Sequence, residues 1–283
     1  MIIIADSGGT KTEWRFINKK GQITQLKSSG LNPNYLENNE IAVLLKKEVS
    51  MVIEEPIQHL YFYGAGCADQ HNQQRLTALL GNHFEMPPER IALNHDLTGA
   101  ARASAGREKG IVCILGTGSN ACLYNGNAIV KKVQNLGFIL GDEGSGAYMG
   151  KTLLKDYFEE KLTSELSALF KTDYPDLTRD VLIKKLYHQG QPNKFLASFF
   201  RFIIKNQGHP YCQSLITSAF DSFVEKYVIP FDQANELPVH FIGGVAHHAN
   251  QYLRKILTQK NLQTGLIMES PIAGLTLYHQ NEI

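Results

Sequence analysis

Two stretches of the chain share one pattern of apolar and polar positions. Residues 2–4 form an apolar run that leads into a glycine-rich turn, after which Trp14 and Phe16 alternate with polar neighbours. Later, the apolar run 110–115 leads into a second glycine-rich turn at 116–120. Such apolar runs predict buried strands, and the alternation predicts a strand with one buried face. The repeated pattern predicts an internal duplication of a strand, turn and hairpin unit.

Strands and helices continue to alternate through the first half. Return strands are predicted at 22–27 and, in the second unit, at 128–133, where Asn125-Gly126 is a strong hairpin signal. A helix is predicted from five apolar residues on one helical face, Ile41, Leu44, Leu45, Val49 and Val52. The elements predicted after it are a strand at 60–63, a helix around Leu76 and Leu80, a strand at 91–94 and a helix at 97–105.

The second half opens in the same order but carries more helix. Helices are predicted at 144–162, 178–188, 195–206 and 211–228. The remaining predicted elements are a strand at 239–242 that ends in Gly243-Gly244, a helix at 250–257, a strand at 266–268 and a final helix after Pro271. The sequence therefore predicts an α/β protein of two domains with a boundary at Gly106.

Composition and charge exclude several classes of function. The chain has 283 residues, 43% of them hydrophobic, and a net charge of +1, so two domains with real cores are expected and nucleic acid is not an expected partner. No stretch is long and apolar enough to predict a membrane span, and residues 2–4 are too short for the apolar core of a signal peptide, so we expect a cytoplasmic protein.

The cysteines and histidines do not predict a metal site. The four cysteines are scattered without a C-x-x-C spacing, so buried free thiols are expected: Cys67, Cys113, Cys122 and Cys212. His247 and His248 are adjacent, and adjacent residues on a helix point in different directions.

The first turn has the composition of a phosphate-binding loop. Asp6 fixes a carboxylate at the end of a buried strand, while Gly8 and Gly9 allow backbone N–H groups to approach an anion. Thr10 and Lys11 add a hydroxyl and a cation at the same place. An ordinary glycine-rich hairpin is the alternative interpretation of this segment taken alone.

The second turn, formed by Gly116, Thr117 and Gly118, is also a candidate phosphate loop. It fits the dinucleotide fingerprint G-x-G-x-x-A, but that motif requires a helix next, and a hairpin is predicted instead. Residues 145–152 come within one position of a Walker A loop, but Ser145 replaces its first glycine and the segment is predicted to be helical already.

Taken together, these motifs resemble the actin, hexokinase and heat-shock-protein ATPase superfamily. Within it, the chain looks most like the N-acetylglucosamine kinases, which are grouped with the BadF/BadG/BcrA/BcrD-type ATPases. The motifs that carry the resemblance lie in order along nearly the whole chain, at residues 6–12, 94–100, 115–120, 137–145 and 242–246.

The resemblance implies two ribonuclease H-like, actin-like ATPase domains with a nucleotide cleft between them. Their implied limits are 1–106 plus the C-terminal helix 270–283, and 107–269. It implies that Thr10, Lys11 and Thr117 contact the phosphates of ATP and that Asp6 acts through water on Mg²⁺. It also implies that three glycines approach the adenosine, namely Gly243, Gly244 and Gly274.

The resemblance also implies a kinase that phosphorylates an N-acetylated amino sugar, N-acetylglucosamine or N-acetylmuramic acid, at the 6-hydroxyl, and it suggests a homodimer. Asp96, at a strand end, is the predicted general base, with an N-cap of the following helix as the alternative role. The implied sugar contacts are Asn34, Ser119, Asn120, Gly137 and Asp142.

Two features qualify the sugar site. Asp142 and Ser145 have a competing structural role as caps of the helix after Gly144. Where the animal enzymes carry a tryptophan, this chain has the smaller Leu136, which leaves room for a bulkier sugar and makes N-acetylmuramic acid a candidate beside N-acetylglucosamine.

Two other functions remain open from the sequence. The first is an ATPase of the type that activates dehydratases and reductases, which would need an iron–sulfur ligand set that the cysteine spacing does not offer. The second is a sugar sensor without catalytic activity. The sequence does not determine which sugar or which hydroxyl is used, or whether the pathway is recycling or catabolic.

Overall fold

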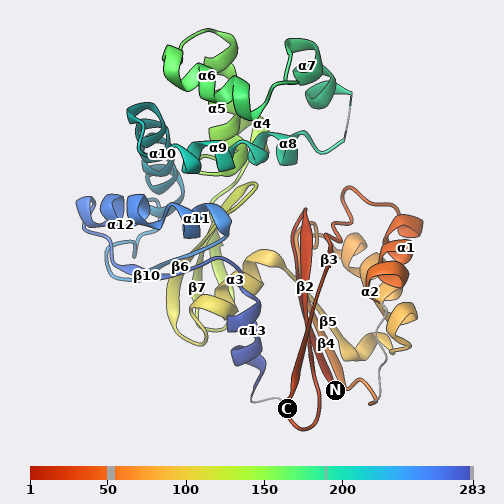
Figure 1. Ribbon diagram of the computed structural model, residues 1–283. Helices are drawn as coiled ribbons and strands as arrows, with labels where there is room; N and C mark the ends of the chain where they lie inside the picture. Colours follow the sequence, from red (N-terminus) through yellow and green to blue (C-terminus); the bar gives the residue numbers. More distant parts are fainter. Residues whose placement is uncertain (50–54, 189, 281–283) are drawn as a thin grey trace. The chain divides into compact units, whose positions relative to one another are not determined.

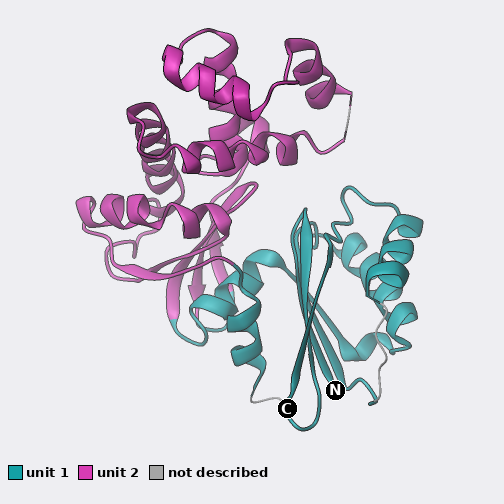
Figure 2. Ribbon diagram, viewed as in Figure 1, with its two compact units in different colours: residues 1–108, 126–128, 270–283 teal, residues 109–125, 129–269 magenta. Residues whose placement is uncertain are grey.

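Each half of the chain folds around its own five-stranded sheet. The computed structural model describes residues 1–49, 55–188 and 190–280, which form two units (Figure 2). Unit 1 contains Met1–Glu108, Gly126–Ala128 and Ser270–Ile283, and unit 2 contains Lys109–Asn125 and Ile129–Glu269. Val52 and residues 281–283, which the sequence assigned to helices, lie outside the described residues.

The sheet of unit 1 has the strand order β3-β2-β1-β4-β5. Strands β1 to β3 form an antiparallel meander, whereas β4 and β5 run parallel to β1. The predicted strands are therefore confirmed, with the bounds β1 Ile2–Ser7, β2 Lys11–Ile17, β3 Ile23–Ser29, β4 His59–Gly64 and β5 Ile91–His95.

Alternation along β1 assigns the two faces of this sheet to different helices. Ile3 and Ala5 belong to the core that packs under α1 (Asn38–Glu48) and α2 (Gln70–Phe84). Ile2 and Ile4 pack instead with Ile272 and Leu275 of α13 (Ile272–His279), beside α3 (Asp96–Ser104). In Figure 1 these two pairs of helices lie on opposite sides of the sheet, and the short helix η1 (Pro88–Arg90) precedes β5.

The sheet of unit 2 has the strand order β10-β9-β6-β7-β8. Counted from the opposite edge, this strand order is equivalent to that of unit 1. Strands β6 to β8 form an antiparallel meander, and β9 and β10 run parallel to β6 on its other side. The predicted internal duplication is confirmed at the level of topology. The strand bounds are β6 Lys109–Leu115, β7 Ser119–Asn125, β8 Ile129–Lys132, β9 Val239–Ile242 and β10 Thr264–Met268.

The helices of unit 2 depart from the prediction in several places. The helix predicted at 144–162 stops at Phe158, because Glu160 adopts a left-handed conformation and Thr163 then caps a separate helix. The segment 195–206 divides at Phe199, and 211–228 ends in one π-helical turn, η2 (Val224–Val228). The bounds are α4 Gly137–Leu140, α5 Gly146–Phe158, α6 Ser164–Asp173, α7 Arg179–Tyr187, α8 Pro192–Ser198, α9 Phe200–Lys205, α10 Pro210–Phe223, α11 Gly244–His248 and α12 Asn250–Gln259.

Two predictions about the bulk of the protein can be compared with the structure. The cysteines are free and buried, as predicted. Among the described residues, no helix combines the length and the apolar character needed to cross a membrane.

Candidate active site

The first candidate loop is the tight connection between β1 and β2. The Gly8 N–H donates to the Lys11 carbonyl at 2.9 Å, which closes the turn. Gly9, Thr10 and Lys11 are exposed, so the loop presents its backbone and the Lys11 side chain to solvent. A short loop between antiparallel strands is the geometry that the sequence predicted here.

Several residues that the sequence did not single out support this loop from below. The Ser7 hydroxyl lies 2.8 Å from the Thr12 hydroxyl and accepts the Leu31 N–H at 2.9 Å. Gly30 donates its N–H to the Thr10 carbonyl at 3.1 Å. A Cβ on Gly30 would lie 2.4 Å from the Gly8 carbonyl oxygen, so this position requires glycine for packing. In the sequence, the feature that could have pointed to this support is the polar segment that begins at Gly30.

The loop glycines themselves are not required by the surrounding protein. A Cβ on Gly9 or Gly116 would meet nothing within 4 Å, and one on Gly8 would make only an ordinary contact with Lys11. None of the three has a positive φ. Since neither backbone strain nor packing explains these glycines, the open space above each backbone suits a close-fitting ligand such as a phosphate.

Asp6 and Asp96 lie at the same edge of the unit 1 sheet. Ser7 pairs with Gly64 of β4, and Gly64 pairs with His95 of β5, so β1 and β5 end side by side across β4. Burial, together with the charges of Asp96 and Glu13, raises the pKa of Asp6 to about 8, although the charge of Lys11 lowers it. These carboxylates therefore form one electrostatically coupled cluster.

Asp96 is the first residue of α3 rather than its N-cap. His95 occupies the cap position, and its Nδ1 accepts the Leu97 N–H at 3.2 Å. The alternative of an N-cap role for Asp96 is therefore wrong. Asp96 Oδ1 is buried, lies 2.9 Å from His95 Nδ1 and has no hydrogen-bond donor among the described residues. This oxygen remains available to accept a proton or a hydrogen bond.

Asn34 lies on a loop that α2 holds in place. The Asn72 side-chain N–H₂ donates to Asn34 Oδ1 at 2.6 Å and to the Gly66 carbonyl at 3.0 Å. Arg75 donates to the Pro33 carbonyl at 3.0 Å and to the Leu36 carbonyl at 2.7 Å. The bond from Asn72 occupies one lone pair of the Asn34 oxygen, so the Asn34 side chain can offer a ligand its N–H₂ group and the second lone pair. The sequence analysis missed both Asn72 and Arg75.

The second candidate loop connects β6 to β7 and is held by α5. The Gly116 N–H donates to the Gly118 carbonyl at 3.0 Å. Two N–H groups at the start of α5, those of Gly146 and Ala147, donate to the Gly116 and Thr117 carbonyls at 2.9 and 3.1 Å. These amides face the loop, and Gly150 packs against the Leu196 carbonyl, so the segment 145–152 is not a Walker A loop.

Asn135 links Ser119 to Asp142 in unit 2, because its side-chain N–H₂ donates to the Ser119 carbonyl and to Asp142 Oδ1, and Asn120 follows Ser119 on β7. Asp142 Oδ1 accepts the Ser119 N–H at 3.1 Å and the Asn135 N–H₂ at 2.7 Å. Asn120 Oδ1 accepts the Ala121 N–H at 2.9 Å. Burial raises the pKa of Asp142 although the bonds from Asn135 and Ser119 lower it. Asn135, which the sequence analysis missed, is the hub of this cluster.

The capping roles considered for Asp142 and Ser145 separate in the structure. The Ser145 hydroxyl accepts the Tyr148 N–H at 3.1 Å and caps α5. Asp142 does not cap this helix, and its side chain accepts hydrogen bonds from Ser119 and Asn135. The Ser119 hydroxyl is buried without a hydrogen-bond partner among the described residues. An unpartnered buried hydroxyl next to Asp142 suits a polar ligand. Gly137, at the start of α4, has a φ of +72° and open space above it.

The three glycines assigned to adenosine differ in their surroundings. Gly243 has a φ of +125° and would place a Cβ 2.2 Å from the Leu115 carbonyl oxygen. Gly274 packs α13 against α3, where a Cβ would lie 2.3 Å from the Ala103 carbonyl oxygen. Packing within a single unit therefore explains both. Gly244 has nothing within 4 Å of its Cβ position and remains free to accommodate a ligand.

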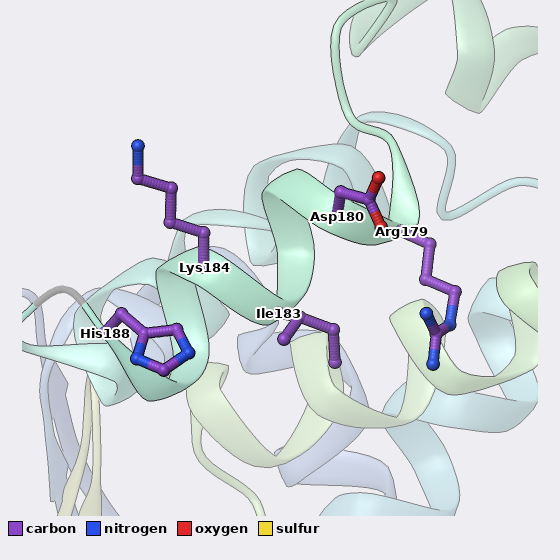
Figure 3. Close-up of a pocket in the computed structure, with 5 residues that line it drawn as sticks. All are labelled: Arg179, Asp180, Ile183, Lys184 and His188. Carbon is purple, nitrogen blue, oxygen red and sulfur yellow. The ribbon is translucent and has the colours of Figure 1, made fainter.

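A separate hollow lies alongside α7. It has a volume of about 530 Å³ and is lined by Arg179, Asp180, Ile183, Lys184 and His188 (Figure 3). Lys184 extends away from Arg179 and Ile183, so the two cations do not converge on one point. None of the predicted site residues lines this hollow.

The described residues contain no group of three or more histidine, cysteine or acidic side chains arranged to hold a metal ion directly. The Asp6 and Asp96 carboxylates, with a buried acceptor oxygen and an open glycine loop beside them, suit a hydrated cation that arrives with phosphate. The donor set therefore fits Mg²⁺ bound through water.

Comparison with known proteins agrees with this geometry. The model of the BadF/BadG/BcrA/BcrD ATPase family matches residues 5–276. A proposed N-acetylglucosamine kinase from Porphyromonas gingivalis is 38% identical, with a TM-score of 0.92 and coverage of 99% of both chains. A proposed N-acetylglucosamine kinase from Chromobacterium violaceum (18% identity, TM-score 0.73, 98% of both chains) shares the fold. So does a ROK family glucokinase from Streptomyces griseus, solved with glucose and AMPPNP (15% identity, TM-score 0.61, 99% of this chain and 98% of that chain).

Proposed function

The chain belongs to the BadF/BadG/BcrA/BcrD ATPase family, and from this premise we propose that it is an ATP-dependent kinase of an N-acetylated amino sugar. The observation that carries the proposal is the pair of hairpin loops whose glycines face open space, one of them beside a coupled pair of carboxylates. The P. gingivalis relative, a proposed N-acetylglucosamine kinase, supports the substrate class.

The loops are proposed to bind the phosphates of ATP. Backbone N–H groups of Gly9 and Gly118 and the hydroxyls of Thr10 and Thr117 donate to phosphate oxygens, and Lys11 supplies a positive charge, while the Gly8 N–H closes the turn. Phosphoryl transfer depends mainly on such positioning and charge neutralisation. When bound through water to Asp6, Mg²⁺ supplies further charge neutralisation at the phosphates. Gly244 leaves room for the nucleoside.

Asp96 is proposed as the general base. Its buried Oδ1 has no hydrogen-bond donor in the described part of the chain and can accept the proton of a sugar hydroxyl as that hydroxyl attacks the γ-phosphate. The attacked group is the γ-phosphoryl, the leaving group is ADP, and the proton passes to the Asp96 carboxylate. The 6-hydroxyl is the proposed position on the sugar.

The residues proposed to bind the sugar are Asn34, Ser119, Asn120, Gly137 and Asp142. Asn34 donates through its N–H₂ group, the Ser119 hydroxyl has no partner among the described residues, Asp142 accepts the Ser119 N–H, and Asn120 is the next residue of β7. Leu136 is 57% exposed, and a side chain smaller than tryptophan leaves room for an added lactyl group. N-Acetylmuramic acid is therefore a proposed substrate beside N-acetylglucosamine.

The test is a coupled ADP-release assay with Mg-ATP and a panel of sugars. The panel contains N-acetylglucosamine, N-acetylmuramic acid, N-acetylmannosamine, N-acetylgalactosamine, glucosamine and glucose, with a control that lacks sugar. ADP release that depends on an N-acetylated sugar supports the proposal. ADP release without sugar, or no release at all, contradicts it and favours an activator-type ATPase or a silent sensor.

A further inference from the structure

Glu13 is a buried carboxylate that the proposed chemistry does not use. Its side chain is 8% exposed, yet two lysines contact the same oxygen: Lys11 Nζ lies 3.2 Å and Lys27 Nζ 3.4 Å from Glu13 Oε1. The other oxygen, Oε2, accepts a hydrogen bond from the Ser270 hydroxyl, just before α13. One buried acid therefore connects the phosphate loop, the edge strand β3 and the start of the C-terminal helix.

Strand register explains why these groups meet. Glu13 of β2 pairs with Asp6 of β1 on one side and with Lys27 of β3 on the other. Residues two apart on a strand share a face, so Lys11 lies next to Glu13 on the same side of β2. Lys11 is thus the only member of the group that also belongs to the exposed loop, where its side chain is 53% exposed.

We propose that Glu13 is a positioning residue that holds Lys11 while the loop is empty and releases it to the phosphates of ATP, with Lys27 keeping Glu13 paired after the exchange. This inference rests on the proposed function, since it requires that ATP binds at the loop.

Moving Lys11 from Glu13 to the phosphates costs little free energy, because a second cation, Lys27, stays paired with Glu13. A buried carboxylate that loses its sole partner is strongly destabilising. Here Lys27 remains on Oε1 and Ser270 on Oε2 when Lys11 leaves. Burial raises the pKa of Glu13, but the hydrogen bond from Ser270 and the charge of Lys11 bring it below its ordinary value, so the acid stays ionised and attractive to both lysines.

The arrangement predicts opposite effects from two substitutions. In Glu13→Gln, Lys11 is no longer paired before ATP arrives, and glutamine can still accept the bond from Ser270, so affinity rises by about three- to fivefold, the worth of one ion pair. In Lys27→Met, Glu13 would be left without a cation when Lys11 departs, so affinity falls by about three- to tenfold.

The experiment measures the Kd of Mg-AMPPNP by calorimetry for the unmutated protein, Glu13→Gln, Lys27→Met and the double variant. Lys20→Met, which removes an exposed positive charge from the turn between β2 and β3, is the matched control for long-range charge. If Lys27 acts through Glu13, Lys27→Met has no effect in the Glu13→Gln background. A thermal melt of each variant verifies that it is folded.

The outcomes separate the inference from the function. Opposite shifts in Kd with loss of the Lys27 effect in the double variant support the inference. Binding by the unmutated protein with the same or weaker binding by Glu13→Gln overturns the inference alone, as does an effect of Lys27→Met that persists in the double variant. Because the Lys27 side chain is 73% exposed, Lys27→Met tests the idea even if Glu13→Gln does not fold. No binding by the unmutated protein overturns the proposed function and the inference together.

Discussion

The two hairpin loops are copies in topology but differ in charge. In unit 1, the last strand pairs before the loop are Asp6 with Glu13 and Ser7 with Thr12. In unit 2, the corresponding pairs are Ile114 with Asn120 and Leu115 with Ser119. Unit 1 therefore has a carboxylate on each strand where unit 2 has an apolar side chain and an amide.

Their supports differ as well. Gly30, Ser7 and Thr12 brace the first loop from within the meander, whereas the first amides of α5 hold the second loop. The difference teaches that duplication supplies a backbone shape suited to phosphate, while the side chains around each loop determine what that loop contributes. We infer that unit 1 supplies charge for catalysis and that the β6–β7 loop of unit 2 supplies neutral donors for binding.

The largest expected effect tests whether catalysis depends on the carboxylates of unit 1. Asp96→Asn keeps the shape of the side chain and removes its ability to accept a proton, so kcat should fall by about 10²- to 10⁴-fold with little change in KM. The measurement is the coupled ADP-release assay with the preferred sugar. Asp69→Asn is a matched control, because asparagine caps α2 as well as aspartate does. Near-normal turnover of Asp96→Asn would refute the base assignment.

Alanine substitutions in the two glycine loops test whether both loops bind the phosphates of ATP. Gly9→Ala and Gly116→Ala place a methyl group in open space, so Tm should not change, while the KM for ATP should rise by about tenfold or more. Gly30→Ala is the contrasting control, since its Cβ would clash with the Gly8 carbonyl and should lower Tm. Unchanged ATP kinetics in both loop variants would mean that no ligand occupies this space.

A smaller effect is expected at Ser119 in unit 2. Ser119→Ala removes a buried hydroxyl that has no partner among the described residues, so stability should stay the same or rise slightly. If the hydroxyl binds the sugar, the KM for the sugar should increase by about five- to tenfold. Sugar-dependence of initial rates and a thermal melt measure the two effects. A lower Tm with an unchanged sugar KM would assign Ser119 a structural role.

The smallest expected effect is a difference in pH dependence between the units. The folded pKa of Asp6 is raised from 3.8 to about 8, so its contribution to stability is lost as pH rises through that range. Asp6→Asn should therefore gain stability relative to the unmutated protein between pH 5 and pH 8, by roughly 2–5 °C in Tm. The melts are recorded with EDTA to keep Mg²⁺ from the carboxylate.

Glu143 in unit 2 should behave in the opposite way. Burial raises its pKa, but hydrogen bonds from Lys226 and Tyr227 bring the net value below the ordinary 4.5. Its contribution to stability is present above that value and is lost as pH falls through the folded pKa. Glu143→Gln should thus have a lower Tm at pH 7, and the gap should close in acid. Parallel pH profiles for Asp6→Asn and Glu143→Gln would contradict the contrast between the units.

Much of the fold could be predicted from the sequence because its signals are local. The strands β1, β2, β6 and β7 are apolar or alternating runs, and the turns between them carry glycine. The helices of unit 2 were harder, since α6 begins only because Glu160 turns left-handed and Thr163 caps a new helix. No strong pattern of apolar residues in the sequence predicts either the left-handed conformation of Glu160 or the cap at Thr163.

By itself, the sequence determined the two loops, the strand-end Asp6 and the duplicated meander, because strand, turn and loop signals lie within a few adjacent residues. Only the tertiary structure decided the coupling of Asp6 with Asp96, the bond by which Asn72 holds Asn34, and the position of Asn135 between Ser119 and Asp142. It also decided that packing requires glycine at positions 30 and 274. These depend on strand register and on contacts between segments far apart in the chain, which no local pattern encodes.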